Sequence, residues 1–189
     1  MKNVNVSRVH ALVVAAGLLA WAPAGQAQAP AAGPDKKPGL EVCYMYKFIR
    51  HVDEITEWAK TLQCEPGGSL ANLDFYGGVS KVLTSKEEDG VMARITGFIQ
   101  LEKAGAYKFA FESNDGARLK IDGKQIVEDP DVHDDRFSEL GTMEVAKPGW
   151  YPISVDFFER KSTWTLRLLW RLPGAEGDLV PVPAMALAH

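Results

Sequence analysis

The sequence is poor in the residues that build many catalytic centres. It contains four histidines and two cysteines in 189 residues. No two histidines stand at the i, i+4 spacing of a helical zinc site. A G-x-S-x-G nucleophile turn, a glycine-rich phosphate loop and a dinucleotide fingerprint are also missing. These absences argue against zinc hydrolases, serine hydrolases and nucleotide-binding enzymes, and they leave open a glycosidase built on two carboxylates.

The two cysteines are Cys43 and Cys64. If the chain is exported to an oxidising compartment, a disulfide between them is the simplest interpretation. A catalytic thiol is the alternative, and it would need a poised histidine that the sequence gives no sign of.

The N-terminal apolar run is too short to cross a bilayer, which takes about 20 residues. It extends from Ala11 to Ala22, follows Lys2 and Arg8, and precedes the small residues Gly25-Gln26-Ala27. This order is typical of a secretory signal peptide. We therefore expect residues 1–27 to be a cleaved signal, with a short membrane anchor as the alternative.

An excess of positive charge is also missing. Without residues 1–27 the chain keeps 19 basic and 25 acidic side chains, a net charge of −6. Such a surface does not attract nucleic acid. Residues 28–38, rich in Pro, Ala and Gly, are expected to form a flexible linker. We expect an exported protein, periplasmic or secreted, with no membrane span.

What the sequence does contain is apolar alternation with a period of two. The clearest segments cover residues 91–101, 107–111, 151–157 and 164–170. Many short strands with turns between them predict an all-β fold, either an antiparallel β-sandwich or a partly closed barrel. The Asp122-Gly123 pair between two apolar runs predicts a tight hairpin.

One segment breaks this alternation. Between Asp53 and Leu62, the residues Ile55, Trp58 and Ala59 fall at helical spacing, and Asp53 is a suitable N-cap. We expect one short helix near the N-terminus of the mature chain.

A set of linked motifs runs from Gly97 to Trp170 and on to the C-terminal end. Its parts are Asn114-Asp115-Gly116, Ile121-Asp122-Gly123, His133, Pro148-Gly149-Trp150, and the closing Leu168, Trp170, Pro173 and Gly174. Together they resemble the protective-antigen-type PA14 (PA-14) domain family. The resemblance covers residues 39–189, and it implies one β-sandwich or barrel-like module of a kind found in adhesins, toxins and glycosidases. The best-understood members bind carbohydrate.

The resemblance also implies a metal site. In yeast flocculins and epithelial adhesins, the loop that matches Asn114-Asp115 has two consecutive aspartates, which hold a Ca²⁺ that ligates sugar hydroxyls. Asn114 replaces the first of them here and removes one negative charge. Since carboxylates supply most of the attraction for Ca²⁺, we expect millimolar affinity at best.

Four residues are predicted to contact a ligand: Asn114, Asp115, Gly116 and Trp164. We expect Asn114 and Asp115 at the centre of one end of the sandwich, with the 128–135 loop and the 159–164 turn beside them. The first three of the four are expected to form a rigid turn that presents oxygen atoms, with Gly116 supplying a positive φ. A plain structural turn is the alternative. Trp164 has the flat ring that sugars stack on, but it shares an alternating face with Leu166 and Leu168, which favours core packing over stacking.

An acidic run around His133 provides a second candidate for the metal, with Asp129, Asp131 and Asp135 as its expected ligands; the run consists of Glu128, Asp129, Asp131, Asp134 and Asp135. It does not fit an EF-hand, because counting from Asp129 places Asp134 at position six and Leu140 at position twelve. A looser site with ligands among Asn114, Asp115, Asp129 and Asp131 is one interpretation, and a solvated loop is the other.

Together these features predict an exported, non-catalytic module that binds a carbohydrate or cell-envelope glycan, with possible help from Ca²⁺. A structural or assembly protein that binds another envelope protein is the alternative. A glycoside hydrolase is the third hypothesis.

Overall fold

The computed structural model describes residues 36–189. The signal peptide expected over residues 1–27 and the larger part of the linker expected over 28–38 lie outside the described residues. The last linker residues pair with the C-terminus: the Lys37 amide donates to the His189 carbonyl at 2.7 Å, and the His189 amide donates to the Lys37 carbonyl at 2.8 Å. The domain therefore begins a few residues earlier than residue 39.

Strands dominate the described part of the chain. They are β1 (Glu41–Tyr46), β2 (Glu65–Pro66), β3 (Asp74–Gly78), β4 (Val91–Leu101), β5 (Gly105–Asn114), β6 (Ala117–Ile121), β7 (Lys124–Asp129), β8 (Arg136–Phe137), β9 (Gly141–Val145), β10 (Gly149–Glu159), β11 (Trp164–Arg171), β12 (Val180–Pro181) and β13 (Leu187–Ala188). The helices are α1 (Asp53–Trp58) and the 3-10 turn η1 (Ala184–Ala186). Neither helix is long and apolar enough to cross a membrane.

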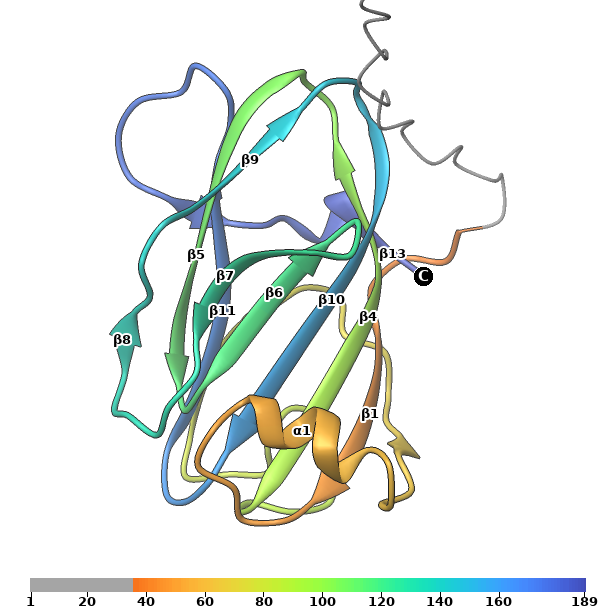
Figure 1. Cartoon of the computed structure of the whole chain (residues 1–189), viewed down its shortest axis with the longest axis vertical. Helices are drawn as coiled ribbons and strands as arrows, with labels where there is room; N and C mark the ends of the chain where they lie inside the picture. The colour runs from red at the N-terminus through yellow and green to blue at the C-terminus, as the bar shows by residue number, and fades with distance from the viewer. Residues whose placement is uncertain (1–35) are drawn as a thin grey trace, which may run out of the picture.

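The strands form two antiparallel sheets that lie face to face (Figure 1). The seven-stranded sheet has the order β2–β1–β4–β10–β6–β7, with β13 also paired to β4. The six-stranded sheet has the order β12–β11–β5–β8, with β3 beside β11 and β9 beside β5. The expected all-β sandwich is confirmed, and the two sheets stay separate rather than closing into a barrel.

The alternating apolar residues meet between the two sheets. Seven fully buried examples from both sheets are Phe109, Phe111, Leu119, Val155, Phe157, Leu166 and Leu168. Burial of each such side chain favours the folded state by about 1.5–3 kcal/mol relative to exposure. This core fixes the strand ends and thereby the loops that connect them.

The predicted hairpin at Asp122-Gly123 is confirmed. It joins β6 to β7, and the register places Ile121 opposite Lys124. Asp122 has φ 52° and Gly123 has φ 72°. A two-residue turn with positive φ at both positions matches the twist of the flanking strands, which explains the choice of Asp and Gly.

The predicted helix exists but is shorter than expected, and its predicted N-cap was wrong. It ends at Trp58, whereas we expected it to end near Cys64, and Val52 occupies the N-cap position without a side-chain hydrogen bond. Asp53 does not cap the helix, because its carboxylate pairs with Arg118 of β6.

Helix α1 covers the outer face of the seven-stranded sheet at one end of the sandwich (Figure 1). Its buried Ile55 belongs to a small second core with Val52, Met92 of β4 and Phe158 of β10. The preceding segment also reaches the β7–β8 connection, since the Val52 amide donates to the Pro130 carbonyl at 2.9 Å.

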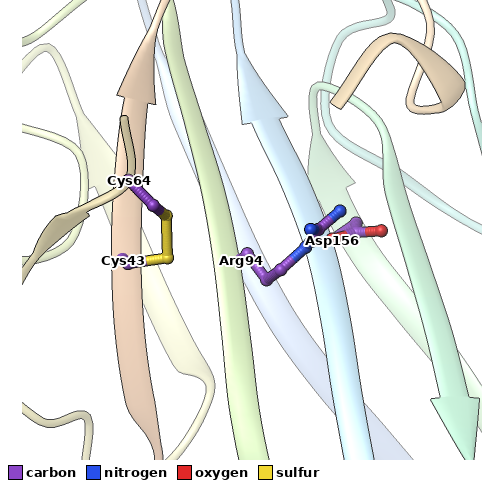
Figure 2. The surroundings of a disulfide bond; sticks show 4 residues. All are labelled: Cys43, Cys64, Arg94 and Asp156. Carbon is purple, nitrogen blue, oxygen red and sulfur yellow. Dashed lines mark hydrogen bonds and ion pairs between the residues drawn. A yellow bond between two sulfur atoms is a disulfide. The ribbon is translucent and has the colours of Figure 1, made fainter. Parts of the chain in front are cut away.

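The predicted disulfide between Cys43 and Cys64 is present, with a Cα–Cα distance of 5.4 Å. It joins β1 to the segment that follows α1. Figure 2 shows it beside the ion pair of Arg94 and Asp156, in which Arg94 Nε donates to Asp156 Oδ1 at 2.9 Å. Cys43, Arg94 and Asp156 stand opposite one another on β1, β4 and β10, so the bond and the ion pair lie in one row across the sheet.

Replacing both cysteines with serine should lower the free energy of unfolding by about 3 kcal/mol, because the bond closes a loop of 21 residues in the unfolded chain. Urea denaturation of the oxidised wild type and the double variant would measure this. Reduction of the wild type by dithiothreitol should give the same loss. Equal midpoints for all three samples would contradict the prediction.

Candidate functional site

Three connections meet at one end of the sandwich and enclose a hollow of about 360 Å³. They are the crossing from β5 to β6, the β7–β8 connection and the β10–β11 turn. The lining residues are Asn114, Asp115, Val132, His133, Asp134, Arg160, Lys161, Ser162 and Thr163. This volume is within the range of small-molecule sites, about 300–1,000 Å³.

The Asn114-Asp115-Gly116 segment is a crossing between sheets rather than the tight turn we expected. Asn114 ends β5 in the six-stranded sheet, and Ala117 begins β6 in the seven-stranded sheet. The peptide bond between Asn114 and Asp115 is cis. The segment therefore lies across the end of the sandwich, between the two layers.

Gly116 serves a different purpose from the predicted one. It is not among the described residues with positive φ. A Cβ at this position would lie 2.6 Å from Cε1 of Phe158 and 2.7 Å from the Pro130 carbonyl oxygen. Glycine is required because the crossing passes close to β10 and to the β7–β8 connection.

The Asp115 carboxylate joins the other two connections. Its Oδ1 accepts a hydrogen bond from the His133 amide at 3.1 Å, and its Oδ2 accepts one from the Arg160 amide at 2.7 Å. The side chain is buried, and only 3% of the residue is exposed. Burial raises the pKa of Asp115, while the two amide hydrogen bonds act in the opposite direction. A single carboxylate thus accepts the hydrogen bonds of two loop amides that lie outside the strand ladders.

Asn114 and Asp89 hold the β10–β11 turn from its two sides. Asn114 Nδ2 donates to Thr163 Oγ1 at 3.1 Å, and the Ser162 amide donates to Asp89 Oδ1 at 2.9 Å. Ser162 has φ 86°. These contacts fix a backbone conformation that serine rarely adopts on its own. They also leave Asn114 Oδ1 without a protein partner in the described part of the chain.

Of the acidic run, the structure brings Asp134 to the hollow, but neither Asp129 nor Asp131. Asp129 is buried and pairs with Arg136, whose Nε donates to Asp129 Oδ2 at 2.9 Å and whose Nη2 donates to Oδ1. Its Oδ2 also lies 3.4 Å from Nε2 of His133. Asp131 is exposed, and neither aspartate lines the hollow. Among residues 36–189, no three His, Cys, Asp or Glu side chains converge on a common metal position.

The sequence profile of the PA14 domain matches residues 71–182. The chain belongs to the PA14 domain family. This match covers more than half of the sequence and includes all three connections around the hollow. The resemblance seen in the linked motifs is therefore confirmed.

Solved structures share this PA14 fold at low sequence identity. A PA14 sugar-binding domain from an RTX adhesin is 17% identical with a TM-score of 0.62, over 80% of this chain and 98% of that one. The epithelial adhesin 6 A domain from Candida glabrata, in complex with Galβ1-3GlcNAc, is 11% identical with a TM-score of 0.62, over 82% and 88%. No curated protein sequence matches.

A third similar structure is much longer than this chain. It is an anti-sigma factor domain-containing protein from Clostridium clariflavum, 22% identical with a TM-score of 0.60 over 80% of this chain. The present chain spans 47% of its length.

Trp164 lies in the core of this PA14 domain rather than at the hollow. Only 4% of it is exposed, and its Nε1 donates to the Ser80 carbonyl at 3.1 Å. A Cβ on Gly77 would lie 1.8 Å from its ring, which shows how closely β3 covers it. The ring has no open face for a sugar, so its burial favours core packing, the interpretation we weighed against stacking.

Sequence reasoning placed the 159–164 turn beside Asn114 and Asp115, as the structure has it, but it named none of Arg160, Lys161 and Thr163 as site residues. A polar turn between two strands gives no motif that would single them out. Asp89 belongs to a separate loop, and only the fold brings it to the β10–β11 turn. His133 was noted as part of the family pattern, but its backbone amide, rather than its ring, is what Asp115 binds.

Glu159 is the most perturbed acid near the site. It is 1% exposed, and neither carboxyl oxygen has a hydrogen-bond partner among residues 36–189. Burial, together with the nearby charges of Asp89 and Asp115, raises the pKa of Glu159 to about 8. The nearby Gly90 amide lowers the pKa of Glu159, but less than burial raises it. This amide donates its hydrogen bond to the Arg160 carbonyl at 3.1 Å rather than to Glu159. Glu159 is therefore protonated at neutral pH.

The Glu159→Gln variant should be more stable than the wild type at neutral and alkaline pH. Below the ordinary pKa of 4.5, the carboxyl is protonated in both the folded and the unfolded chain. As the pH rises from there to about 8, only the unfolded chain releases the proton, which destabilises the wild type by up to about 5 kcal/mol. Glutamine has the same shape and no proton to release. Thermal melts across this pH range would show the difference.

The exposed Glu139→Gln is the matched control and should leave the pH profile unchanged. Parallel stability curves for Glu159→Gln and the wild type, at every pH, would contradict a buried neutral carboxyl.

Proposed function

We propose that the chain is an exported, non-catalytic module that binds carbohydrate in the hollow around Asp115. Membership of the PA14 family supports this, as do the similar folds of a sugar-binding adhesin domain and of an adhesin bound to Galβ1-3GlcNAc. The disulfide fits an oxidising compartment outside the cytoplasm, either periplasmic or extracellular. A cell-envelope glycan is the ligand that this location would offer.

The observation that carries the proposal is the double hydrogen bond of Asp115 to the His133 and Arg160 amides. It holds two loops in place before any ligand arrives. Binding to loops that are already ordered avoids the entropy cost of ordering them. The hollow therefore resembles a preformed site more than a gap between mobile loops.

The lining suits hydroxyl groups. Arg160 and Lys161 supply donors, Asn114 Oδ1 is an acceptor without a protein partner, and Thr163 can act both ways. Arg160 Nε is buried without a hydrogen-bond partner in the described residues. A buried donor of this kind is costly unless something satisfies it, and a sugar hydroxyl or a water molecule can do so.

The arrangement of the carboxylates supports binding without catalysis. A glycosidase needs two carboxyl groups that face each other across the scissile bond, one of them free to give a proton. The lining has only Asp115 and Asp134, and both Asp115 oxygens already accept backbone hydrogen bonds. The neutral Glu159 does not line the hollow.

Calcium fits this site only weakly. Asn114 Oδ1 and the second lone pairs of the Asp115 oxygens would hold it, and a bound Ca²⁺ would attract sugar hydroxyls as further ligands. The lining also carries Arg160 and Lys161, whose charges oppose a cation. With one carboxylate at its centre, the site should bind Ca²⁺ with millimolar affinity at best.

Glycan-array screening should detect binding by the wild type and none by Asp115→Ala, because the variant releases both loop amides. Asp115→Asn, which keeps the size of the side chain but offers only one acceptor oxygen, should bind weakly. Asp131→Asn is the matched control, since Asp131 is an exposed carboxylate in the neighbouring β7–β8 connection and does not line the hollow. Thermal melts would confirm that each variant is folded.

A wild type that binds no glycan on the array, yet captures an envelope protein in a pull-down, would overturn the carbohydrate proposal in favour of an assembly protein. Release of reducing sugar from polysaccharides would overturn the non-catalytic assignment.

Calorimetric titration with CaCl₂ should give a millimolar Kd that Asp115→Asn abolishes and Asp131→Asn leaves unchanged. Micromolar affinity would contradict the expected weakness of the site. If Asp131→Asn also lost binding, the ligands would include the acidic run instead.

A further inference from the structure

The outer face of the six-stranded sheet carries two large exposed aromatic rings. Tyr76 on β3 is 64% exposed, and Phe137 on β8 is 62% exposed. Aromatic rings contribute a large apolar contact area, and tyrosine in particular is enriched at binding surfaces. The proposed hollow does not include either ring.

Tyr76 is fixed in place despite its exposure. Its ring packs over the guanidinium of Arg167, with Cζ 4.5 Å from the ring centroid. Its hydroxyl donates to Glu112 Oε2 at 2.9 Å and accepts a hydrogen bond from Arg167 Nη1. One face of the ring is thus covered by a cation, and the opposite face is open to solvent.

Arg167 is itself held on both sides. Its Nε donates to Asp74 Oδ1 at 2.6 Å, and its Nη1 donates to Glu112 Oε2 at 2.6 Å. Residues of β3, β11 and β5 therefore form one support beneath the ring. An aromatic surface that is ordered in advance loses little entropy on binding.

The strand register connects this ring to the hollow. Tyr76 stands opposite Thr165, and Thr165 stands opposite Asn114. Directly opposed residues share a face of the sheet, so Tyr76 lies two strand spacings, about 10 Å, from Asn114. Phe137 stands opposite Glu112, on the other side of β5 and two residues along from Asn114. The sheet face between the two rings leads directly to the hollow.

We propose that this face extends the hollow into an elongated site for an oligosaccharide of several units, in which Tyr76 stacks on a sugar ring and Phe137 flanks the chain. This inference rests on the proposed carbohydrate function. Flat C–H faces of pyranose rings match an open aromatic face, and hydroxyls match the carboxylate and guanidinium edges. A protein partner would need about 800 Å² of complementary surface per side, whereas here the apolar groups are two separate rings over an ion-pair network.

The probes are β-linked gluco- and galacto-oligosaccharides of one to six units, tested on an array and then by calorimetry with the best series. The wild type should bind the longest member at least tenfold more tightly than the disaccharide. Tyr76→Ala should remove roughly tenfold of that affinity and leave disaccharide binding within twofold of the wild type. Tyr76→Phe, which keeps the ring and loses its hydroxyl anchor, should show a partial loss.

Met185→Ala is the matched control. Met185 is 84% exposed and lines a separate cavity with Glu102 and Lys103, at the other end of the sandwich. It should bind every probe like the wild type.

Equal affinity for short and long probes, or unchanged hexasaccharide binding by a folded Tyr76→Ala variant, would overturn the extended site. If Asp115→Ala still abolished binding in that case, the hollow would remain the proposed carbohydrate site, without the extension over Tyr76. Absence of binding to any probe by the wild type would overturn both proposals, and Tyr76-dependent capture of a protein would replace them.

Discussion

The geometry of the candidate site depends on one buried carboxylate. Asp115 stands where the chain crosses from one sheet to the other, and it accepts the amides of His133 and Arg160 from two further connections. Those amides cannot pair in a strand ladder, and leaving them unpaired near the core would cost about 1–3 kcal/mol each. The carboxylate therefore holds the β7–β8 and β10–β11 connections against the β5–β6 crossing. The residues that line the hollow are thus fixed to the strands of the sandwich.

The same end of the molecule concentrates acid groups that the protein holds in different states. Asp115 and Asp89 are stabilised by backbone amides, whereas the buried Glu159 beside them has no hydrogen-bond partner in the described chain and keeps its proton. Arg160 and Lys161 line the hollow together with the carboxylates of Asp115 and Asp134. We propose that this mixed lining, in which Asn114 carries no charge, recognises neutral hydroxyl groups and binds a divalent cation only weakly.

Local patterns predicted the sandwich well because the core enforces them. Period-two alternation in β5, β10 and β11 reflects residues that must face the opposite sheet, and the Asp122-Gly123 turn needs positive φ whatever surrounds it. The same patterns placed Asn114 and Asp115 at the site but misjudged their surroundings. Burial of Trp164 by Gly77, the close approach of Phe158 to Gly116, and the contact of Asp89 with Ser162 all join residues that are distant in the sequence. The predicted N-cap was wrong because the Asp53 carboxylate pairs with Arg118 of β6, which is distant in the sequence.

The central claim is that ligands enter between the loops that Asp115 holds. Backbone NMR of the oxidised chain, titrated with a binding oligosaccharide, tests it most directly. The account predicts the largest amide shifts at residues 114–116, 132–134 and 160–163, with His133 and Arg160 among them. Shifts clustered instead around the cavity beside Tyr107 and Trp170, with the three loops unmoved, would contradict it.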